Sequence, residues 1–282
     1  MHTYRAHPDV SVLSDYLEVP GLGFLPVNAF VIHAREPVVV DTGLGLPDRD
    51  FLAALAEVID PADVRWIWLT HPDRDHTGGL FPLLDAAPQA RVVTTFLGAG
   101  IMSCEHPLPL DRVYLVNPGQ VLDAGDRQLT GFRPPLFDNP ATVGIFDSST
   151  GICLSSDCFG APLPTAELAS AHSAAALDKS DMRAGQLLWA NVDSPWVQNV
   201  DTAKFAASFQ PLRDFAPAAV LSTHLPPIAG DISAPVATLL DAPHADPFVG
   251  PDQAVLEAML REFSPRGAPD EEKMPGARAG RP

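Results

Sequence analysis

Four side chains that can bind metal ions crowd into the short segment HPDRDH near the start of the chain. These are His71, Asp73, Asp75 and His76, and two glycines follow them closely. Imidazole nitrogens and carboxylate oxygens are the ligands that hold neighbouring divalent cations in proteins. A simpler alternative is a turn in which both aspartates bond backbone amides and the histidines are incidental. The density of ligand types favours a metal-binding loop.

Apolar strands are expected to deliver the candidate ligands at their carboxyl ends. The strand 64–69 (VRWIWL) leads into the metal loop, and a short strand 218–222 leads to His224. A hairpin with the turn SSTG ends close to Asp157. Residues from several strand ends can converge on one edge of stacked sheets, so the pattern predicts one shared site.

The remaining pattern predicts strands and helices in two successive groups. Apolar and β-branched runs predict further strands at 10–18, 25–33, 36–40, 91–95, 112–116, around 121, 128–132, 142–147 and 152–155. Helical spacing predicts helices at 49–59, 78–84, 97–105, 165–177, 185–215, 233–241 and 251–263, the first capped by Asp48 and the fifth broken at Pro195 and Pro211. Strands and helices before residue 116 are thus followed by strands and helices after it. This favours an α/β fold, an αββα sandwich of two mixed β-sheets packed face to face with helices outside.

The organisation of the chain is expected to be simple. We predict one domain over residues 1–263, with a helical insert at 161–215 near the site. Residues 264–282 are rich in proline, glycine and charge, which predicts a disordered tail.

Composition excludes several classes of partner. The 282 residues carry a formal charge of −17, which leaves no basic face for nucleic acid or an anionic membrane. We therefore expect a small-molecule substrate. The cysteines Cys104, Cys153 and Cys158 lack CxxC spacing, and the sequence shows neither a leader pattern nor a membrane-spanning run, so a reduced, cytoplasmic protein is expected.

These motifs together resemble the metallo-β-lactamase fold superfamily, over roughly residues 10–240. The matching segments are DTG at 41–43, THPDRDHTGG at 70–79, SSDCFG at 155–160 and STH at 222–224. The superfamily signature is HxHxDH, and Asp73 stands where most members have the second histidine. A carboxylate there is similar to the flavodiiron branch, which has HxExDH, and SSDCFG also resembles that branch.

The resemblance implies a ligand set for two metal ions. His71, Asp73 and Asp157 would bind the first ion. Asp75, His76 and His224 would bind the second, with Asp157 bridging both. Asp157 could instead cap the following loop, and His224 could be a strand-end histidine bonded to backbone.

One ligand of the family is missing. Members usually carry another histidine on the loop before the bridging aspartate, and FRPPLFDNPATVG contains none. Asp138 is the best substitute, because Pro134, Pro135 and Pro140 restrain this loop. As a lone aspartate in a proline-rich turn, it is equally a candidate turn former.

Three functions follow from this ligand set. Its many carboxylates favour iron, or manganese, over zinc, and the resemblance implies a non-haem diiron oxidoreductase or O2-binding protein. No bound flavin is expected, so an external electron donor would be needed. The alternative is a hydrolase of esters, lactones, thioesters or phosphodiesters, whose metal-bridging hydroxide is oriented by Asp75 as the catalytic residue. In it, the insert with Trp189, Asn191 and Trp196 would shape the pocket. The third possibility is a binding module with a degenerate site. A homodimer is compatible with all three.

Overall fold

The computed structural model describes residues 1–263, so the predicted disordered tail, 264–282, lies outside the described residues. The chain divides into two compact units, residues 1–247 and 248–282. The predicted domain limits of 1–263 stay a prediction. The second unit contributes the helix α10 (Gln253–Phe263).

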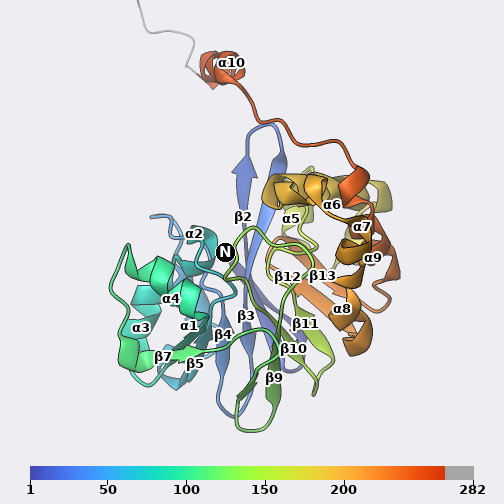
Figure 1. Cartoon of the computed structure of the whole chain (residues 1–282). Coiled ribbons are helices and arrows are strands. Elements are labelled where there is room, and N and C mark those ends of the chain that lie inside the picture. Colours follow the sequence, from blue (N-terminus) through green and yellow to red (C-terminus); the bar gives the residue numbers. More distant parts are fainter. Residues whose placement is uncertain (264–282) are drawn as a thin grey trace, which may run out of the picture. The chain divides into compact units, whose positions relative to one another are not determined.

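Two mixed β-sheets and their helices form the first unit (Figure 1). The seven-stranded sheet has the order β1 (His2–His7), β2 (Val10–Val19), β3 (Gly23–Ile32), β4 (Val38–Val40), β5 (Trp66–Trp68), β6 (Arg91–Thr94), β7 (Val113–Leu115). The six-stranded sheet has the order β13 (Leu225–Ala229), β12 (Ala219–Ser222), β11 (Ile152–Leu154), β10 (Gly144–Asp147), β9 (Gln128–Phe132), β8 (Val121–Asp123). Strands β4 to β7 are parallel, as are β11 and β12, and the other pairs are antiparallel.

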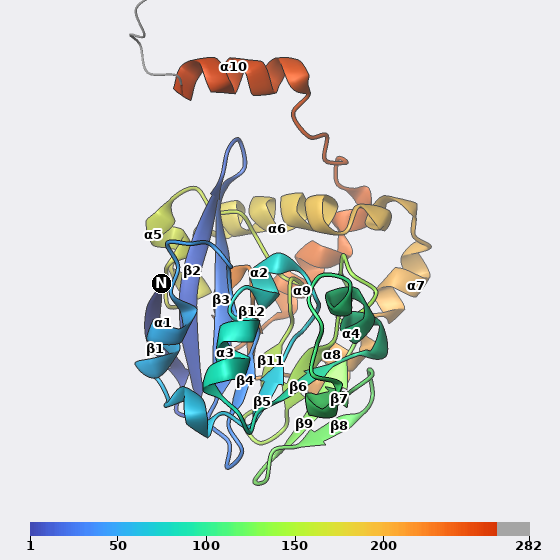
Figure 2. The same ribbon diagram turned by 90° about the vertical axis from the view of Figure 1, so that its left-hand side faces the viewer.

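Helices cover the outer face of each sheet (Figures 1 and 2). The seven-stranded sheet is covered by α1 (Phe51–Ala56), α2 (Arg74–Thr77), α3 (Leu80–Ala86) and α4 (Phe96–Ser103). The six-stranded sheet is covered by α6 (Lys179–Asp193), α7 (Thr202–Ala207), α8 (Gln210–Phe215) and α9 (Ser233–Leu240), while α5 (Ala166–Ala169) contacts β2 and β3 of the other sheet. Short 3-10 helices lie at Pro61–Asp63, Leu110–Arg112, Ala174–Ala176, Pro195–Asn199 and Ala242–His244. The predicted αββα sandwich is confirmed.

Alternating side chains fill the two sides of each sheet. Val38, Val40 and Trp68 belong to the core between the sheets. Their neighbours Val39 and Ile67 point the other way and pack against α1, α3 and α4. Because successive side chains of a strand point to opposite faces, a strand buried on both sides reads as a continuous apolar run. This explains the uninterrupted VVV and WIW segments.

The start of α1 differs from the prediction. The helix begins at Phe51, and the side chain of Asp50 accepts a hydrogen bond from the Ala53 backbone N–H at 2.9 Å. The predicted cap, Asp48, lies outside the helix and pairs with Arg49. The assignment of Asp48 was wrong because the helix starts two residues later, where Asp50 alone can reach the free N–H groups.

Two edge strands, β1 and β13, were not predicted. Each is the first strand at one edge of its sheet, so only one side of its backbone must be paired. Strand β13 contains Pro226 and Pro227, which lack an N–H donor, and an edge position tolerates this loss. The two prolines therefore prevented the prediction of β13 from sequence, although an edge strand can contain them.

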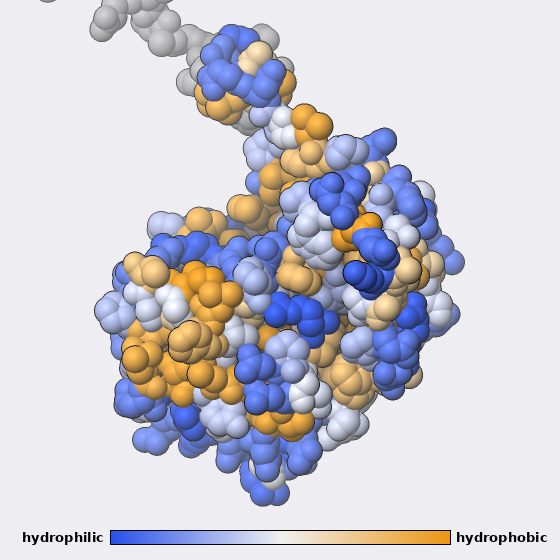
Figure 3. Space-filling model, viewed as in Figure 1, coloured by the Kyte–Doolittle hydropathy of each residue, from blue (hydrophilic) through white to orange (hydrophobic). Residues whose placement is uncertain are grey.

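Apolar side chains are also exposed on the outer helix layer. Phe96 and Leu110 are 80% and 71% exposed, and Leu97, Ile101 and Leu115 are exposed as well. Figure 3 shows a broad hydrophobic area on the side of the molecule where α4 and β7 lie. Contiguous surfaces of this kind favour protein contacts.

None of the helices within residues 1–263 combines the length and apolarity needed to cross a membrane.

Candidate metal centre

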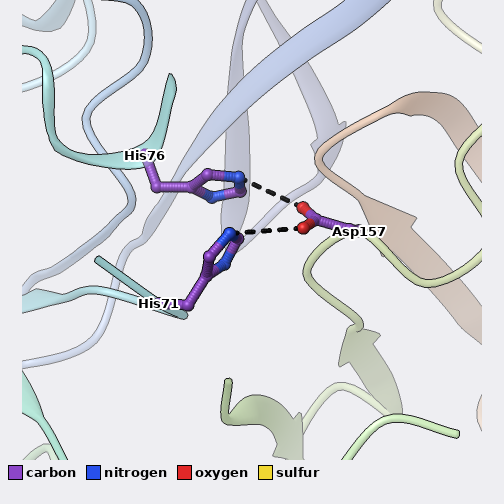
Figure 4. Close-up of side chains that lie close together, drawn as sticks. All are labelled: His71, His76 and Asp157. Atoms are coloured by element: carbon purple, nitrogen blue, oxygen red, sulfur yellow. Dashed lines mark ion pairs between the residues drawn. The ribbon is translucent and has the colours of Figure 1, made fainter. Parts of the chain in front are cut away.

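Strand ends of both sheets deliver the predicted ligands to one place. His71 follows β5, and the short helix α2 carries Asp75 and His76. From the other sheet, Asp157 follows β11 and His224 follows β12. Figure 4 shows the two histidines of the metal loop facing Asp157 from the opposite side. Since β11 and β12 are parallel neighbours, their carboxyl ends place Asp157 and His224 side by side.

The first group of ligand atoms surrounds Nε2 of His71. This nitrogen lies 3.3 Å from Oδ2 of Asp157 and 3.6 Å from Oδ1 of Asp138. Oδ2 of Asp73 is 4.0 Å away. We call this group the first position; one oxygen each of Asp73 and Asp138 and one His71 nitrogen all lie within 4.8 Å of one another. Such spacing suits ligands that share one cation.

The second group surrounds the other oxygen of Asp157. Its Oδ1 lies 3.1 Å from Nε2 of His76 and 3.1 Å from Nε2 of His224. Oδ2 of Asp75 lies 3.5 Å and 3.3 Å from the same two nitrogens. We call this group the second position. The two oxygens of Asp157 thus face different positions, which is the geometry of a bridging carboxylate.

Hydrogen bonds on the far side of each imidazole fix its orientation. Nδ1 of His76 donates to Oδ2 of Asp41 at 2.9 Å, and Nδ1 of His224 donates to the backbone carbonyl of Pro26 at 2.7 Å. Nδ1 of His71 lies 3.2 Å from the hydroxyl oxygen of Ser156. With Nδ1 occupied as a donor, each ring presents the Nε2 lone pair to the centre.

A hydroxyl pair links these orienting groups. The Ser156 hydroxyl donates to that of Thr70 at 2.9 Å, so its oxygen is left to accept from His71. The Thr70 hydroxyl donates in turn to Oδ2 of Asp41 at 2.9 Å.

Asp41 and Ser156 both have left-handed backbone conformations, with φ of 56° and 55°. Strain of this kind gathers at functional sites.

Two buried ligand atoms support the assignment of a cation site. Nε2 of His76 and Oδ1 of Asp157 lie 3.1 Å apart with side chains only 0% and 3% exposed, yet neither atom makes a well-aligned hydrogen bond among residues 1–263. Unpaired buried polar atoms are costly and ask for an explanation. A cation that binds both atoms would supply it, so the residues fit a metal ion.

The shifted pKa values of the candidate ligands also favour a bound cation. Burial raises the pKa of Asp138 to about 7, assisted by the nearby carboxylates of Asp157 and Asp73. Burial opposes charge on His224, but Asp157 and Asp75 outweigh it and raise the pKa of this imidazole to about 9. Carboxylates that repel one another and imidazoles that attract protons both mark a site that favours positive charge.

Glycine allows the metal loop to pack against the DTG loop. A Cβ added at Gly78 would lie 2.1 Å from the Gly45 backbone nitrogen, closer than real atoms approach. The Gly78 N–H donates to the Gly43 carbonyl at 3.0 Å, and the Gly79 N–H to the Thr42 carbonyl at 3.1 Å. These bonds hold the loops that carry Asp41 and His76 at a fixed separation.

All seven predicted metal ligands come together in these two positions, and their roles as ligands stay predictions. The seven are His71, Asp73, Asp75, His76, Asp138, Asp157 and His224. The turn role considered for Asp138 is filled by its neighbour Asn139, whose side chain accepts from the Ala141 N–H and donates to Asp73. His224 does bond to backbone, but through Nδ1, which leaves Nε2 for the centre.

Two of the three residues predicted to shape the pocket, Trp189 and Trp196, lie beside candidate ligands or their neighbours. The Trp189 ring lies 4.9 Å from the ring of His224. Trp196 packs against Phe137, next to Asp138, and donates to its carbonyl at 2.8 Å. Asn191 is buried instead, and its amide bonds Leu187 and Gln198.

One acidic residue of the site was missed. Asp193, at the end of α6, offers an oxygen within 4.8 Å of oxygens from Asp138 and Asp157. Burial, and then Asp157 and Asp138, raise its pKa to about 8. The only signal in the sequence was an acid seven residues after Gln186, on the face of α6 that turned out to be buried.

Comparison with known proteins gives a consistent result. Residues 22–159 match the model of the metallo-beta-lactamase superfamily. An anaerobic nitric oxide reductase flavorubredoxin from Salmonella typhi is 28% identical over 134 residues, which cover 47% of this chain and 28% of that protein. The matched part therefore spans less than a third of the length of that relative.

Solved structures share the fold. Rubredoxin oxygen:oxidoreductase from Desulfovibrio gigas superposes with a TM-score of 0.73 at 18% identity, covering 88% of this chain and 63% of that one. The flavodiiron protein from Giardia intestinalis superposes with a TM-score of 0.69 at 17% identity, covering 86% of this chain and 58% of that one. At this identity the likeness establishes the fold.

Proposed function

This chain carries a metallo-beta-lactamase superfamily domain with flavorubredoxin and flavodiiron homologues, and from that premise we propose that it is a flavodiiron-like oxidoreductase. Its substrate would be a small diatomic molecule such as O2 or nitric oxide, bound at a centre of two iron ions. The observation that carries the proposal is the position of Asp157 between the two groups of ligands. One of its oxygens faces His71, and the other faces His76 and His224.

The ligand chemistry supports iron. Three imidazoles and the carboxylates of Asp73, Asp75, Asp138 and Asp157 form an oxygen-rich set, which suits iron or manganese better than zinc. Asp73 is the residue that separates this set from the histidine-rich signature of the superfamily. When bound, the two ions would supply the site for the diatomic molecule and would pass to it the electrons received from a donor.

The protein would control orientation and access. Asp41, Ser156 and the Pro26 carbonyl hold the three imidazoles in place. The side chains of Asp73 and Asp75 are 42% and 30% exposed, so a small molecule can approach from their side. On the inner side of the site, the side chains of His71, His76, Asp157 and His224 are almost fully buried, and this burial excludes water.

Asp75 is proposed as the residue that acts on the substrate. Burial would raise the pKa of its carboxyl, but the neighbouring His76 and His224 lower it below the ordinary value, so Asp75 is ionised at neutral pH. It is both a candidate ligand and partly exposed. It can therefore orient a bound molecule by accepting a hydrogen bond at Oδ2.

The electrons would come from a separate donor. The names of the relatives, flavorubredoxin and rubredoxin oxygen:oxidoreductase, refer to rubredoxin in those proteins. We propose an electron donor protein for this chain as well. The exposed apolar surface of Phe96, Leu97, Ile101, Leu110 and Leu115 is one place to test for protein contacts, including a homodimer.

The test is anaerobic loading of the purified chain with ferrous iron. We expect about two iron ions per chain and consumption of O2 or nitric oxide by the ferrous protein. Hydrolysis of an ester or phosphodiester panel without gas consumption would replace the proposal with a hydrolase. Bound metal with neither activity would indicate a binding module.

The variant Asp73→His sharpens this test. A second imidazole at the first position should raise zinc occupancy and lower any O2 reactivity. The exposed Asp111→Asn serves as the control and should change neither. If Asp73→His left metal preference unchanged, Asp73 would not be a ligand.

A further inference from the structure

The helix α6 presents one polar stripe to the interior of the protein. Gln186 and Asp193 are seven residues apart, two turns along the same face of the helix, and Trp189 lies between them. Together with Asp157 they line a narrow internal gap that is too small for a water molecule. In Figure 2, α6 is the long helix that runs across the upper side of this unit. The gap borders the first position, because Asp157 belongs to both.

Asp193 brings a carboxylate to a place that already has two. One oxygen from each of Asp138, Asp157 and Asp193 lies within 4.8 Å of the others. The one side-chain hydrogen bond that Asp193 accepts among the described residues comes from the Ser194 hydroxyl, at 3.0 Å. Of the three, Asp157 is buried, Asp193 half-buried and Asp138 exposed; carboxylates this close repel one another, and a shared cation relieves the repulsion.

A second, independent feature of the same gap is a buried oxygen without a hydrogen-bond partner. Gln186 is 1% exposed and lines the gap, and its Oε1 has no hydrogen-bond donor within residues 1–263. Its Nε2 is already used, donating to the Phe159 carbonyl at 3.2 Å. The side chains that line the gap therefore include Gln186, with its unpaired oxygen, as well as Asp157 and Asp193 of the acidic cluster.

We propose that Asp193 is a further ligand of the first metal position and, together with Asp138, makes up for the histidine that is absent from the loop carrying Asp138. This inference rests on the proposed two-metal function. The first position would then contain His71 with the carboxylates of Asp73, Asp138, Asp157 and Asp193. One imidazole among four carboxylates selects a hard divalent ion, Mn2+ or Fe2+, over Zn2+.

Metal binding tests the proposal directly. Mn2+ is titrated into the metal-free full chain, and free Mn2+ is measured by electron paramagnetic resonance. The wild type should show two sites. Asp193→Asn, which keeps the size of the side chain, should weaken one site by about tenfold to a hundredfold and leave the other unchanged. The control is Asp181→Asn, which removes an exposed carboxylate from the same helix and should retain both sites.

Two further measurements make every outcome decisive. In a His71→Ala background, which already lacks the first position, Asp193→Asn should cause no additional loss of Mn2+ affinity. Asp193→Glu, which restores a carboxylate, should recover part of the affinity if the loss in Asp193→Asn comes from ligation rather than from misfolding.

The two proposals fail in different ways. A wild-type chain that binds fewer than two Mn2+ ions would overturn the two-metal function itself. A wild type with two sites and an Asp193→Asn variant with the same two affinities would overturn the role of Asp193 alone. Loss of both sites in Asp193→Asn without recovery in Asp193→Glu would also overturn it.

Discussion

Oδ2 of Asp41 lies 2.9 Å from Nδ1 of His76, and both side chains are fully buried. Asp41 comes from the end of β4 and His76 from α2, 35 residues later. The same carboxylate accepts hydrogen bonds from the backbone and hydroxyl of Thr70. One residue that is not a ligand therefore fixes both the ring of His76 and the start of the metal loop.

Replacing Asp41 by asparagine should weaken the second position selectively. Asparagine tolerates the left-handed backbone at this residue, so the loop should keep its path while the charged acceptor for His76 is lost. We expect a fall in metal affinity of about tenfold to a hundredfold, measured by competition with a chelator. The exposed Asp111→Asn is the control. Unchanged affinity in Asp41→Asn would mean that the ring is held by other contacts.

The bridging role of Asp157 predicts an asymmetric set of variants. Asp157→Asn should reduce occupancy of both positions, because each of its oxygens faces one of them. His71→Ala and His224→Gln should each remove one ion. Metal content by mass spectrometry and Mn2+ titration measure this. Loss of a single ion in Asp157→Asn would contradict the bridging geometry.

Close backbone packing predicts a large effect of a single methyl group. In Gly78→Ala, the Cβ would lie 2.1 Å from the Gly45 nitrogen and 2.6 Å from the Gly43 carbonyl oxygen. Because backbone cannot rotate away, we expect destabilisation of about 1–3 kcal/mol, measured by urea unfolding. Gly100→Ala is the matched control. Within residues 1–263, no atom outside its own helix backbone lies within 4 Å of a Cβ at this helical position, and we expect a gain of about 0.5–1 kcal/mol. Equal effects of the two changes would rule out the close approach as the cause.

His33 predicts a pH dependence of stability away from the metal centre. Its Nε2 lies 2.9 Å from the Ser11 hydroxyl, and burial, then the charge of Arg5, lower its pKa. Below the ordinary value of 6.5, the unfolded chain therefore binds more protons than the folded one. Stability is present above that value and is lost as the pH falls through it towards the lowered pKa of the folded state.

The matching variant is His33→Gln, which keeps a side chain that can bond Ser11. Between about pH 7 and 5 its free energy of unfolding should fall less than that of the wild type. The measurement is urea unfolding of the metal-free protein at several pH values. Parallel curves for the two proteins would show that His33 does not titrate differently on folding.

The interior of the site depends on contacts that no local pattern encodes. Nδ1 of His224 donates to the Pro26 carbonyl, 198 residues away in sequence. Asn28 on β3 likewise donates to the Ser222 and Leu225 carbonyls of the other sheet. Such bonds arise only when the two sheets pack against each other, so the orientation of His224 could not be predicted from the chain around it.

The sequence by itself indicated the two sheets apart from their edge strands β1 and β13, helices around them, and seven candidate ligands whose roles stay predictions. Alternating and helical spacing reflect which side chains face a core, and a dense ligand loop reflects local chemistry, so both can be recognised along the chain. Only the tertiary structure decided that Asp50 rather than Asp48 caps α1, and that Asn139 rather than Asp138 makes the turn. It alone brought Asp193 beside Asp157, because the distance between a helix end and a strand end depends on how layers pack and not on their separation in sequence.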